Sequence, residues 1–469
     1  MTFIQTEFLW FFAIVFTVYW SIPSRAIQNL WLGLVSAVFY GWVHPWFLIL
    51  LYVSAIVDYF SAIAMERWWH RRGRILFVSL ATNLVILGYF KYFDFFIVNI
   101  AAAFDALGVH HTLMPLGILL PPGISFYTFQ SMAYSIDVFR GEIKPRKNLL
   151  DYMIAVSLFP HLVAGPVQRA GNLLLQAETN RRFDLQMIRS GFALAMWGAF
   201  KKVVVADTVA PYVDKVFALK DVSGPLVYAA TLGFAVQILA DFSGYTDVAR
   251  GVARMIGFEL VENFKNPYMA TNPSDFWRRW HVSFSTWIKD YLYIPFGGNT
   301  GGFWKQTRAT TFAMLLSGLW HGASWNFVIW GGYHAVILTG YRLVTPNIPG
   351  VLKTQVWSHA ASVVIMFAFT CFGWLLFREM DSAALWSHLT KSPFEAPHNQ
   401  LVASVALLAI TGACSVPLIL GMWIQKRVIP RIQHSEWYLP LQATTWAFFA
   451  VCLFVFVRMS AMDFIYFQF

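Results

Sequence analysis

Three of the chain's twelve histidines, His281, His321 and His334, lie between residues 275 and 334. His281 follows charged and aromatic residues, whereas His321 and His334 lie in apolar surroundings. The imidazole is the side chain whose usual pKa suits proton transfer near neutral pH. Hydrocarbon strongly disfavours ionisable groups, so a histidine at membrane depth indicates a function. We therefore expect this stretch to carry acid–base chemistry.

The strongest catalytic candidate is His321, which lies between Gly318 and Gly322 in an otherwise apolar segment. Glycines remove side-chain bulk and let a ligand or another backbone approach closely. This pattern favours a reaction site, with a buried histidine bonded to a backbone carbonyl as the alternative. For His334, core packing and function are equally good interpretations. No Cys, Asp or Glu stands at metal-ligand spacing from these histidines, so no metal site is expected.

A second candidate is the sequence FWRRWH, residues 276–281, which ends in His281. Its arginines and tryptophans are typical of an anchor in the lipid headgroup layer. The functional alternative is that Arg278 and Arg279 bind an anionic donor, such as the phosphates of a coenzyme, through forked hydrogen bonds. The candidates for donor binding or for lining a tunnel are Arg278, Arg279, Trp320, Gly322, His334 and Asn299.

Two carboxylates, Asp241 and Asp247, surround a glycine in the sequence DFSGYTD. A spacing of six is not a helical i, i+3 or i+4 spacing, so the two side chains need not share a face. Capping or pairing with Arg250 and Arg254 is the structural interpretation. No serine or cysteine lies in a recognisable nucleophile motif, which favours direct transfer over a covalent enzyme intermediate.

The composition indicates a polytopic membrane protein. Of 469 residues, 58% are hydrophobic and 12% are charged, whereas soluble domains carry about 25% charged residues. The net charge of +10 is explained by cytoplasmic Lys and Arg loops, and no solvated basic domain suggests nucleic-acid binding. The cysteines Cys371, Cys414 and Cys452 lie in apolar runs and predict neither a disulfide framework nor a zinc site.

The apolar runs predict an all-α membrane protein with roughly 11 transmembrane helices and one or more re-entrant segments. They form a single domain, residues 1–469. The basic patch at residues 67–74 places the N-terminus outside, three crossings earlier. The run Leu116–Phe139 contains a Pro-Pro-Gly sequence, so its helix is kinked or broken. We expect Leu149–Val163 to re-enter rather than cross, and Phe276–Ile288 to form a half-helix that brings His281 to His321.

These residues resemble the membrane-bound O-acyltransferase superfamily, especially its bacterial polysaccharide branch. The resemblance covers a signature core at about residues 87–341, whereas the C-terminal helices, residues 356–469, are matched mainly in hydrophobicity. The motifs that carry it are LGYFKYFDFF, PPGISFYTFQSMAYSIDVFRG, FPHLVAGPV, DFSGYTDVARG, ENFKNPY, FWRRWHVSFSTWIKDYLYIPFGGN, LWHGASWNFVIWGGYH and FIYFQF.

The resemblance implies a ring of helices around a central tunnel, with His321 and His281 as the catalytic residues. It implies an O-acetyltransferase of the bacterial inner membrane, with acetyl-CoA as a donor substrate rather than a bound cofactor. In that membrane, the orientation inferred from the basic patch makes the N-terminus periplasmic. The acceptor would be a cell-envelope polysaccharide, alginate-like or peptidoglycan, or an SGNH-type acetyltransferase partner in the periplasm. The alternatives are D-alanyl transfer to teichoic acid and non-catalytic transport of a small acyl group.

Overall fold

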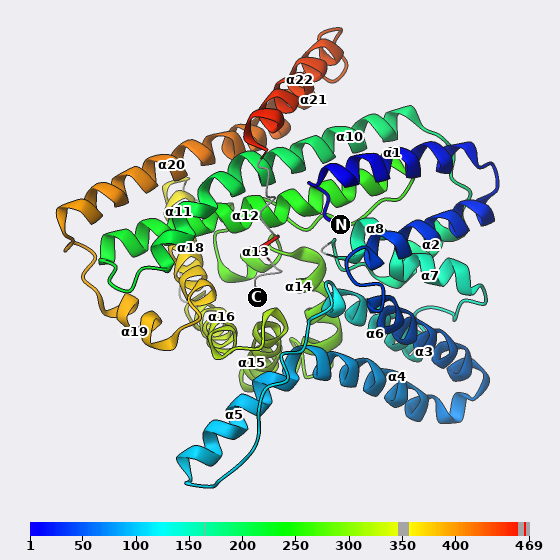
Figure 1. Ribbon diagram of the computed structural model, residues 1–469, viewed down its shortest axis with the longest axis horizontal. Coiled ribbons are helices and arrows are strands. Elements are labelled where there is room, and N and C mark those ends of the chain that lie inside the picture. Colours follow the sequence, from blue (N-terminus) through cyan, green and yellow to red (C-terminus); the bar gives the residue numbers. More distant parts are fainter. Residues whose placement is uncertain (164, 346–355, 458–463, 466–469) are drawn as a thin grey trace. The chain divides into compact units, whose positions relative to one another are not determined.

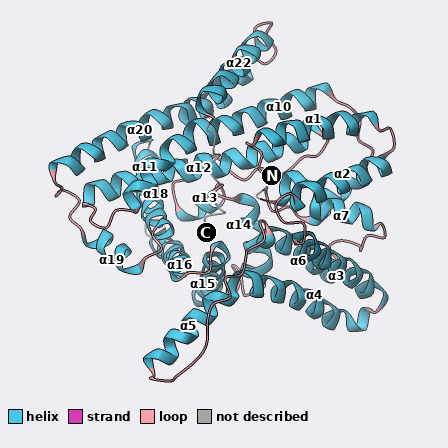
Figure 2. Cartoon of the chain, in the orientation of Figure 1, coloured by secondary structure: helices cyan, strands magenta, loops and turns pink. Residues whose placement is uncertain are grey.

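The computed structural model describes residues 1–163, 165–345, 356–457 and 464–465. Throughout these ranges the secondary structure is helical, without strands (Figures 1 and 2). Six helical segments in the described ranges are long and apolar enough to cross a membrane, and Thr6–Ser21 is a shorter apolar helix. The predicted all-α polytopic fold is confirmed, while the number of crossings stays a prediction. The six segments are Phe47–Arg67, Trp69–Ala106, Gly224–Met255, Trp357–Arg378, His398–Ile432 and Tyr438–Phe456.

The chain forms two compact units. The sequence had predicted one domain. The first unit comprises residues 1–192 and 249–261, and the second comprises residues 193–248 and 262–469. The single domain stays a prediction. Helices α10 (Leu185–Phe200) and α12 (Gly224–Met255) each contribute residues to both units.

The first unit is built around α6, a helix with most of its residues buried. Helix α6 packs on α3 and α4, and a buried carboxylate joins the three. Asp58 of α3 accepts hydrogen bonds from Ser79, from Asn83 at 2.8 Å and from Ser135 of α6 at 3.1 Å. The helices are α1 (Thr6–Ser21), α2 (Arg25–Gly41), α3 (Phe47–Arg67), α4 (Arg72–Leu87), α5 (Phe93–Ala106), α6 (Ile124–Arg140), α7 (Leu149–Ser157), α8 (Phe159–Leu162) and α9 (Ala170–Glu178).

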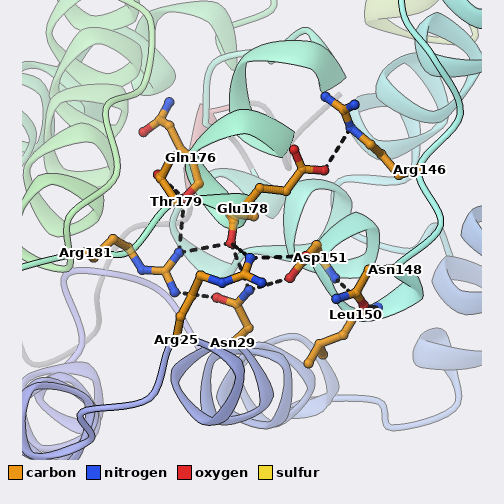
Figure 3. Close-up of polar contacts among 11 residues, drawn as sticks. Arg25, Asn29, Arg146, Asn148, Leu150, Asp151, Gln176, Glu178, Thr179 and Arg181 are labelled. Atoms are coloured by element: carbon orange, nitrogen blue, oxygen red, sulfur yellow. Dashed lines mark hydrogen bonds and ion pairs between the residues drawn. The ribbon is translucent and has the colours of Figure 1, made fainter.

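The C-terminal end of α9 is held by a polar cluster in the same unit (Figure 3). The carbonyl of Ala177 accepts from Arg25 at 3.0 Å, from Asn29 at 3.0 Å and from Arg181 at 3.4 Å. Arg25 and Asn29 also bond to the carboxylate of Asp151 on α7. Cations at a helix C-terminus stabilise its unpaired carbonyls, so the cluster fixes α2, α7 and α9 together.

Two segments that sequence predicted to be broken or re-entrant are interrupted in the structure. The helix expected from Leu116 begins only at Ile124, after Gly123 in a left-handed conformation. The preceding residues run as a loop whose amides bond to the carboxylate of Asp94. The run 149–163 forms α7 and α8, helices of 9 and 4 residues. A helix that short spans less than half of the roughly 30 Å hydrocarbon core.

The second unit contains the three candidate histidines, His281, His321 and His334. Helix α15 packs along α16, α13 contacts α16, and α16 contacts α18 (Figure 1). The helices are α11 (Asp207–Phe217), α13 (Pro273–Trp277), α14 (Val282–Ile288), α15 (Gly302–His321), α16 (Trp325–Val344), α18 (Val356–Arg378), α19 (Ser382–Thr390), α20 (His398–Trp423), α21 (Ile429–Ile432) and α22 (Tyr438–Phe456). π-Helical turns at Lys201–Ala206 and Lys289–Tyr293 follow α10 and α14.

Candidate functional site

His281 lies at a break between two short helices rather than within the single half-helix that sequence predicted. Helix α13 ends at Trp277 and α14 begins at Val282. His281 has φ +43°, a left-handed conformation that costs a residue other than glycine roughly 1–2 kcal/mol. Such strain persists only where the surrounding structure imposes it, and it is concentrated at functional sites.

The side chain that imposes this break is Asn263, which the sequence analysis missed. The main chain of Asn263 accepts a hydrogen bond from the amide of Val282 at 3.0 Å. Its side-chain oxygen accepts from the amide of Ser283 at 3.1 Å and from the Ser283 hydroxyl at 2.6 Å. These bonds fix the start of α14, and with it the direction of His281. The motif ENFKNPY contains this asparagine, but spacing alone did not indicate its partner.

The imidazole of His281 is fully buried among aromatic rings. Its centroid lies 4.8 Å from Phe242, 5.1 Å from Phe284 and 6.0 Å from Trp320. The Phe284 and Trp320 rings stack on one another at 4.2 Å. Aromatic walls exclude water and lower the local dielectric, which strengthens electrostatic interactions with any reacting group between them.

His321 is the last residue of α15, where a three-residue connection turns the chain into α16. The side chain is buried, and its ring centroid lies 5.6 Å from Phe284 and 5.1 Å from Trp320. His281 and His321 therefore contact the same two rings. Residues from separate elements, forty positions apart in sequence, come together at one aromatic pair.

The glycines beside His321 have a different role from the one that sequence suggested. A Cβ atom at residue 318 would lie 2.1 Å from the carbonyl oxygen of Phe327, and one at Gly322 would lie 2.2 Å from the Phe327 ring. A Cβ atom at Gly331 would lie 2.3 Å from the carbonyl oxygen of Met314. Helix α16, not a ligand, occupies this space. The glycines thus permit close packing of α15 on α16, which fixes the end of α15 and His321.

His334, on α16, is buried beside His321. Its ring lies 4.6 Å from Trp330, whose centroid is 5.0 Å from the ring of His321. It also packs against Trp277 of α13 at 5.0 Å. His334 does not contact the Phe284 and Trp320 pair in these ring contacts, and the choice between packing and function for this residue stays open to experiment.

The polar residues predicted to bind the donor lie at accessible positions. The side chain of Arg278 is 68% exposed and lies 3.3 Å from Asp275. Arg279 is half as exposed, pairs with Asp275 at 2.9 Å and donates to the carbonyl of Lys265 at 3.3 Å. Asn299 is exposed and accepts from Tyr293 and Gln306 at 2.7 and 3.0 Å. Of the two arginines, Arg278 has the more exposed side chain, which makes it the better candidate for donor binding.

Two lysines pair with the carboxylates of DFSGYTD. Lys201 lies 2.7 Å from Asp247, and Lys202 lies 2.8 Å from both Asp207 and Asp241. The π-helical turn after α10 carries both lysines, and this turn was not visible in the sequence pattern. The predicted pairing of these carboxylates with Arg250 stays a prediction, and Arg254 pairs with Glu259 at 2.9 Å.

Comparisons with known proteins show the family of the chain. Residues 140–378 match the model of the membrane-bound O-acyltransferase family. The chain is 38% identical to a probable alginate O-acetylase AlgI of Azotobacter vinelandii, over 82% of this chain and 77% of that protein. It is 33% identical to a peptidoglycan O-acetyltransferase of Helicobacter pylori, over 75% of this chain and 71% of that protein.

A teichoic acid D-alanyltransferase of Bacillus subtilis is 28% identical over 57% of this chain and 70% of its own length. The helical membrane architecture and the similarity to these relatives lead to the same family. The chain belongs to the membrane-bound O-acyltransferase family and is a multi-pass membrane O-acyltransferase.

Proposed function

We propose that the protein transfers an acetyl group from a cytoplasmic thioester, acetyl-CoA, to a hydroxyl group outside the inner membrane. The acceptor is a cell-envelope polysaccharide or an SGNH-type periplasmic partner that passes the acetyl group on. Relatives named for acetylation of alginate and of peptidoglycan support this choice. Both are more similar to this chain than the D-alanyltransferase is, which favours acetyl over D-alanyl as the transferred group.

In the proposed mechanism, His321 is the general base. It takes the proton from the acceptor hydroxyl, whose oxygen attacks the thioester carbonyl carbon. The carbon–sulfur bond then breaks, the ester forms, and coenzyme A leaves as a thiolate that takes up a proton. His281 donates a hydrogen bond to the carbonyl oxygen as negative charge develops there. One such donor typically contributes about 2.7–4 kcal/mol to lowering the barrier.

The observation that carries the proposal is the shared position of His281 and His321 at the Phe284 and Trp320 rings. A base and an oxyanion donor must reach neighbouring atoms of one reacting centre. The strained backbone at His281 supports the same assignment. Arg278 is exposed for the donor phosphates, because guanidinium groups bind phosphate through forked hydrogen bonds.

The direct test is purified protein in lipid nanodiscs, incubated with acetyl-CoA labelled in the acetyl group and with a polysaccharide acceptor. We expect free coenzyme A and labelled acceptor ester to appear together. A D-alanyl carrier-protein thioester, assayed in parallel, distinguishes the D-alanyl alternative. Uptake of label into liposomes without thioester cleavage would contradict the proposal and indicate a transporter instead.

A further inference from the structure

Phe464 and Ile465, which lie in the motif FIYFQF, are buried in the second unit. Each is 2% exposed. The amide of Ile465 donates a hydrogen bond to the carboxylate of Asp241 at 2.7 Å. A hydrogen bond to an ionised acceptor is roughly twice as strong as a neutral one. Ile465 is therefore docked at a specific carboxylate on α12.

Asp241 accepts this bond in addition to its ion pair with Lys202. One carboxylate oxygen lies 2.8 Å from the lysine, and the other accepts from the amide of Ile465. A buried carboxylate requires partners for both oxygens. Lys202 therefore pairs with one oxygen of Asp241, and the Ile465 amide satisfies the other.

Two aromatic contacts connect Phe464 to His281, with Phe242 taking part in both. The Phe464 ring stacks on Tyr245 at 4.5 Å and packs against Phe242 at 5.5 Å. Phe242 is the ring that meets His281 edge-on at 4.8 Å. The Phe242 ring thus lies between the chain end and the imidazole.

We propose that Phe464 and Ile465 are positioning residues for His281, and that they act by holding Phe242 against the imidazole. The role in turnover rests on the proposed acetyl transfer, whereas the docking itself does not. Loss of the dock lets Phe242 move and misplaces the oxyanion donor. A misplacement of about 1 Å from a change outside the chemistry can cost roughly a hundredfold in rate.

The matched pair Ile465→Pro and Ile465→Val tests the role. Proline has no backbone N–H, so it removes the bond to Asp241, whereas valine keeps the bond and a similar shape. With labelled acetyl-CoA, we expect Ile465→Pro to lower kcat at least about tenfold while donor KM changes less than about twofold. Ile465→Val should retain wild-type kcat. Phe464→Leu should recover part of the kcat that Phe464→Ala loses.

Amide hydrogen exchange tests the dock without any activity. The Ile465 amide should exchange at least about tenfold more slowly than a free-chain amide in wild type, and faster in Phe464→Ala. Exchange at the free-chain rate in wild type would refute the dock. Wild-type kcat in Ile465→Pro would refute the positioning role. Failure of wild type to cleave acetyl-CoA would refute the proposed function, and the exchange result would still decide the dock.

Discussion

Adding one methyl group at Gly318 should inactivate the enzyme by displacing His321. The Cβ atom would lie 2.1 Å from the carbonyl oxygen of Phe327 and 3.3 Å from the Cα atom of Gly331. Carbon contacts are favourable only from about 3.5 Å, so α15 and α16 must separate by roughly 1 Å. Overpacking of this kind costs about 1–3 kcal/mol of stability. His321 lies one turn further along the same helix.

Neighbouring glycines on α16 provide the matched control. A Cβ atom at Gly331 would lie 2.3 Å from the carbonyl oxygen of Met314, whereas one at Gly332 would meet only the side chain of Leu315, at 3.8 Å. Gly331→Ala should therefore behave like Gly318→Ala, and Gly332→Ala like wild type. All three replacements raise helix propensity equally, so differences between them report packing.

The assay combines labelled acetyl transfer with thermal unfolding in detergent. We expect Gly318→Ala and Gly331→Ala to lower kcat/KM by roughly a hundredfold, since about 1 Å of misplacement can cost that much. Their Tm values should fall, while Gly332→Ala keeps both quantities. Wild-type activity and Tm in Gly318→Ala would refute the close packing of α15 on α16 as the feature that positions His321.

Four further changes test other parts of the structure. Asp58→Leu should lower the free energy of unfolding by about 2–4 kcal/mol, because it leaves serine and asparagine donors buried without their acceptor; an unchanged denaturation midpoint would contradict this. Lys202→Met should lower the free energy of unfolding by about 3–5 kcal/mol, since it removes the cation that pairs with the carboxylates of Asp207 and Asp241; an unchanged urea denaturation midpoint in detergent would contradict this. Arg278→Ala should raise donor KM while Tm stays constant, because an exposed ion pair contributes at most about 1 kcal/mol; an unaltered KM would remove it from donor binding. A cysteine replacing Arg72 should be labelled only after the inner membrane is permeabilised, and one replacing Asp105 should be labelled in intact spheroplasts, whereas the inverse pattern would overturn the predicted orientation.

Much of the fold followed from local sequence. Apolar runs predicted helices, and the Pro-Pro-Gly sequence before Ile124 predicted a break, because proline and glycine act on the backbone where they stand. The run 149–163 forms two short helices, and the expectation that it does not cross the membrane stays a prediction. The sequence pattern also drew attention to His281, His321 and His334 among twelve histidines, and their catalytic roles stay predictions.

The arrangement of the site could not be read from spacing, because long-range contacts determine it. The backbone break at His281 depends on Asn263, whose bonds reach across about twenty residues. The pairing of Asp241 with Lys202 depends on a π-helical turn that no periodicity reveals. The glycines near His321 were expected to admit a ligand or another backbone, and the fold decides between them, because α16 fills that space.

The chain end illustrates the same limit. The sequence placed FIYFQF among the family motifs but gave no partner for it. In the structure, the Ile465 amide meets Asp241, 224 residues away. Ile465 and Asp241 come together only in the folded chain, so no local sequence pattern could have predicted this contact.

The central claim is that His321 accepts the proton of the attacking hydroxyl. The most direct measurement compares acetyl transfer by wild type, His321→Ala and His321→Gln in nanodiscs, at matched protein amounts and with Tm recorded for each. Glutamine approximates the size of the imidazole but cannot take the proton, so both variants should transfer acetyl no faster than background while remaining folded. Substantial transfer by either folded variant would contradict the assignment of His321 as the base.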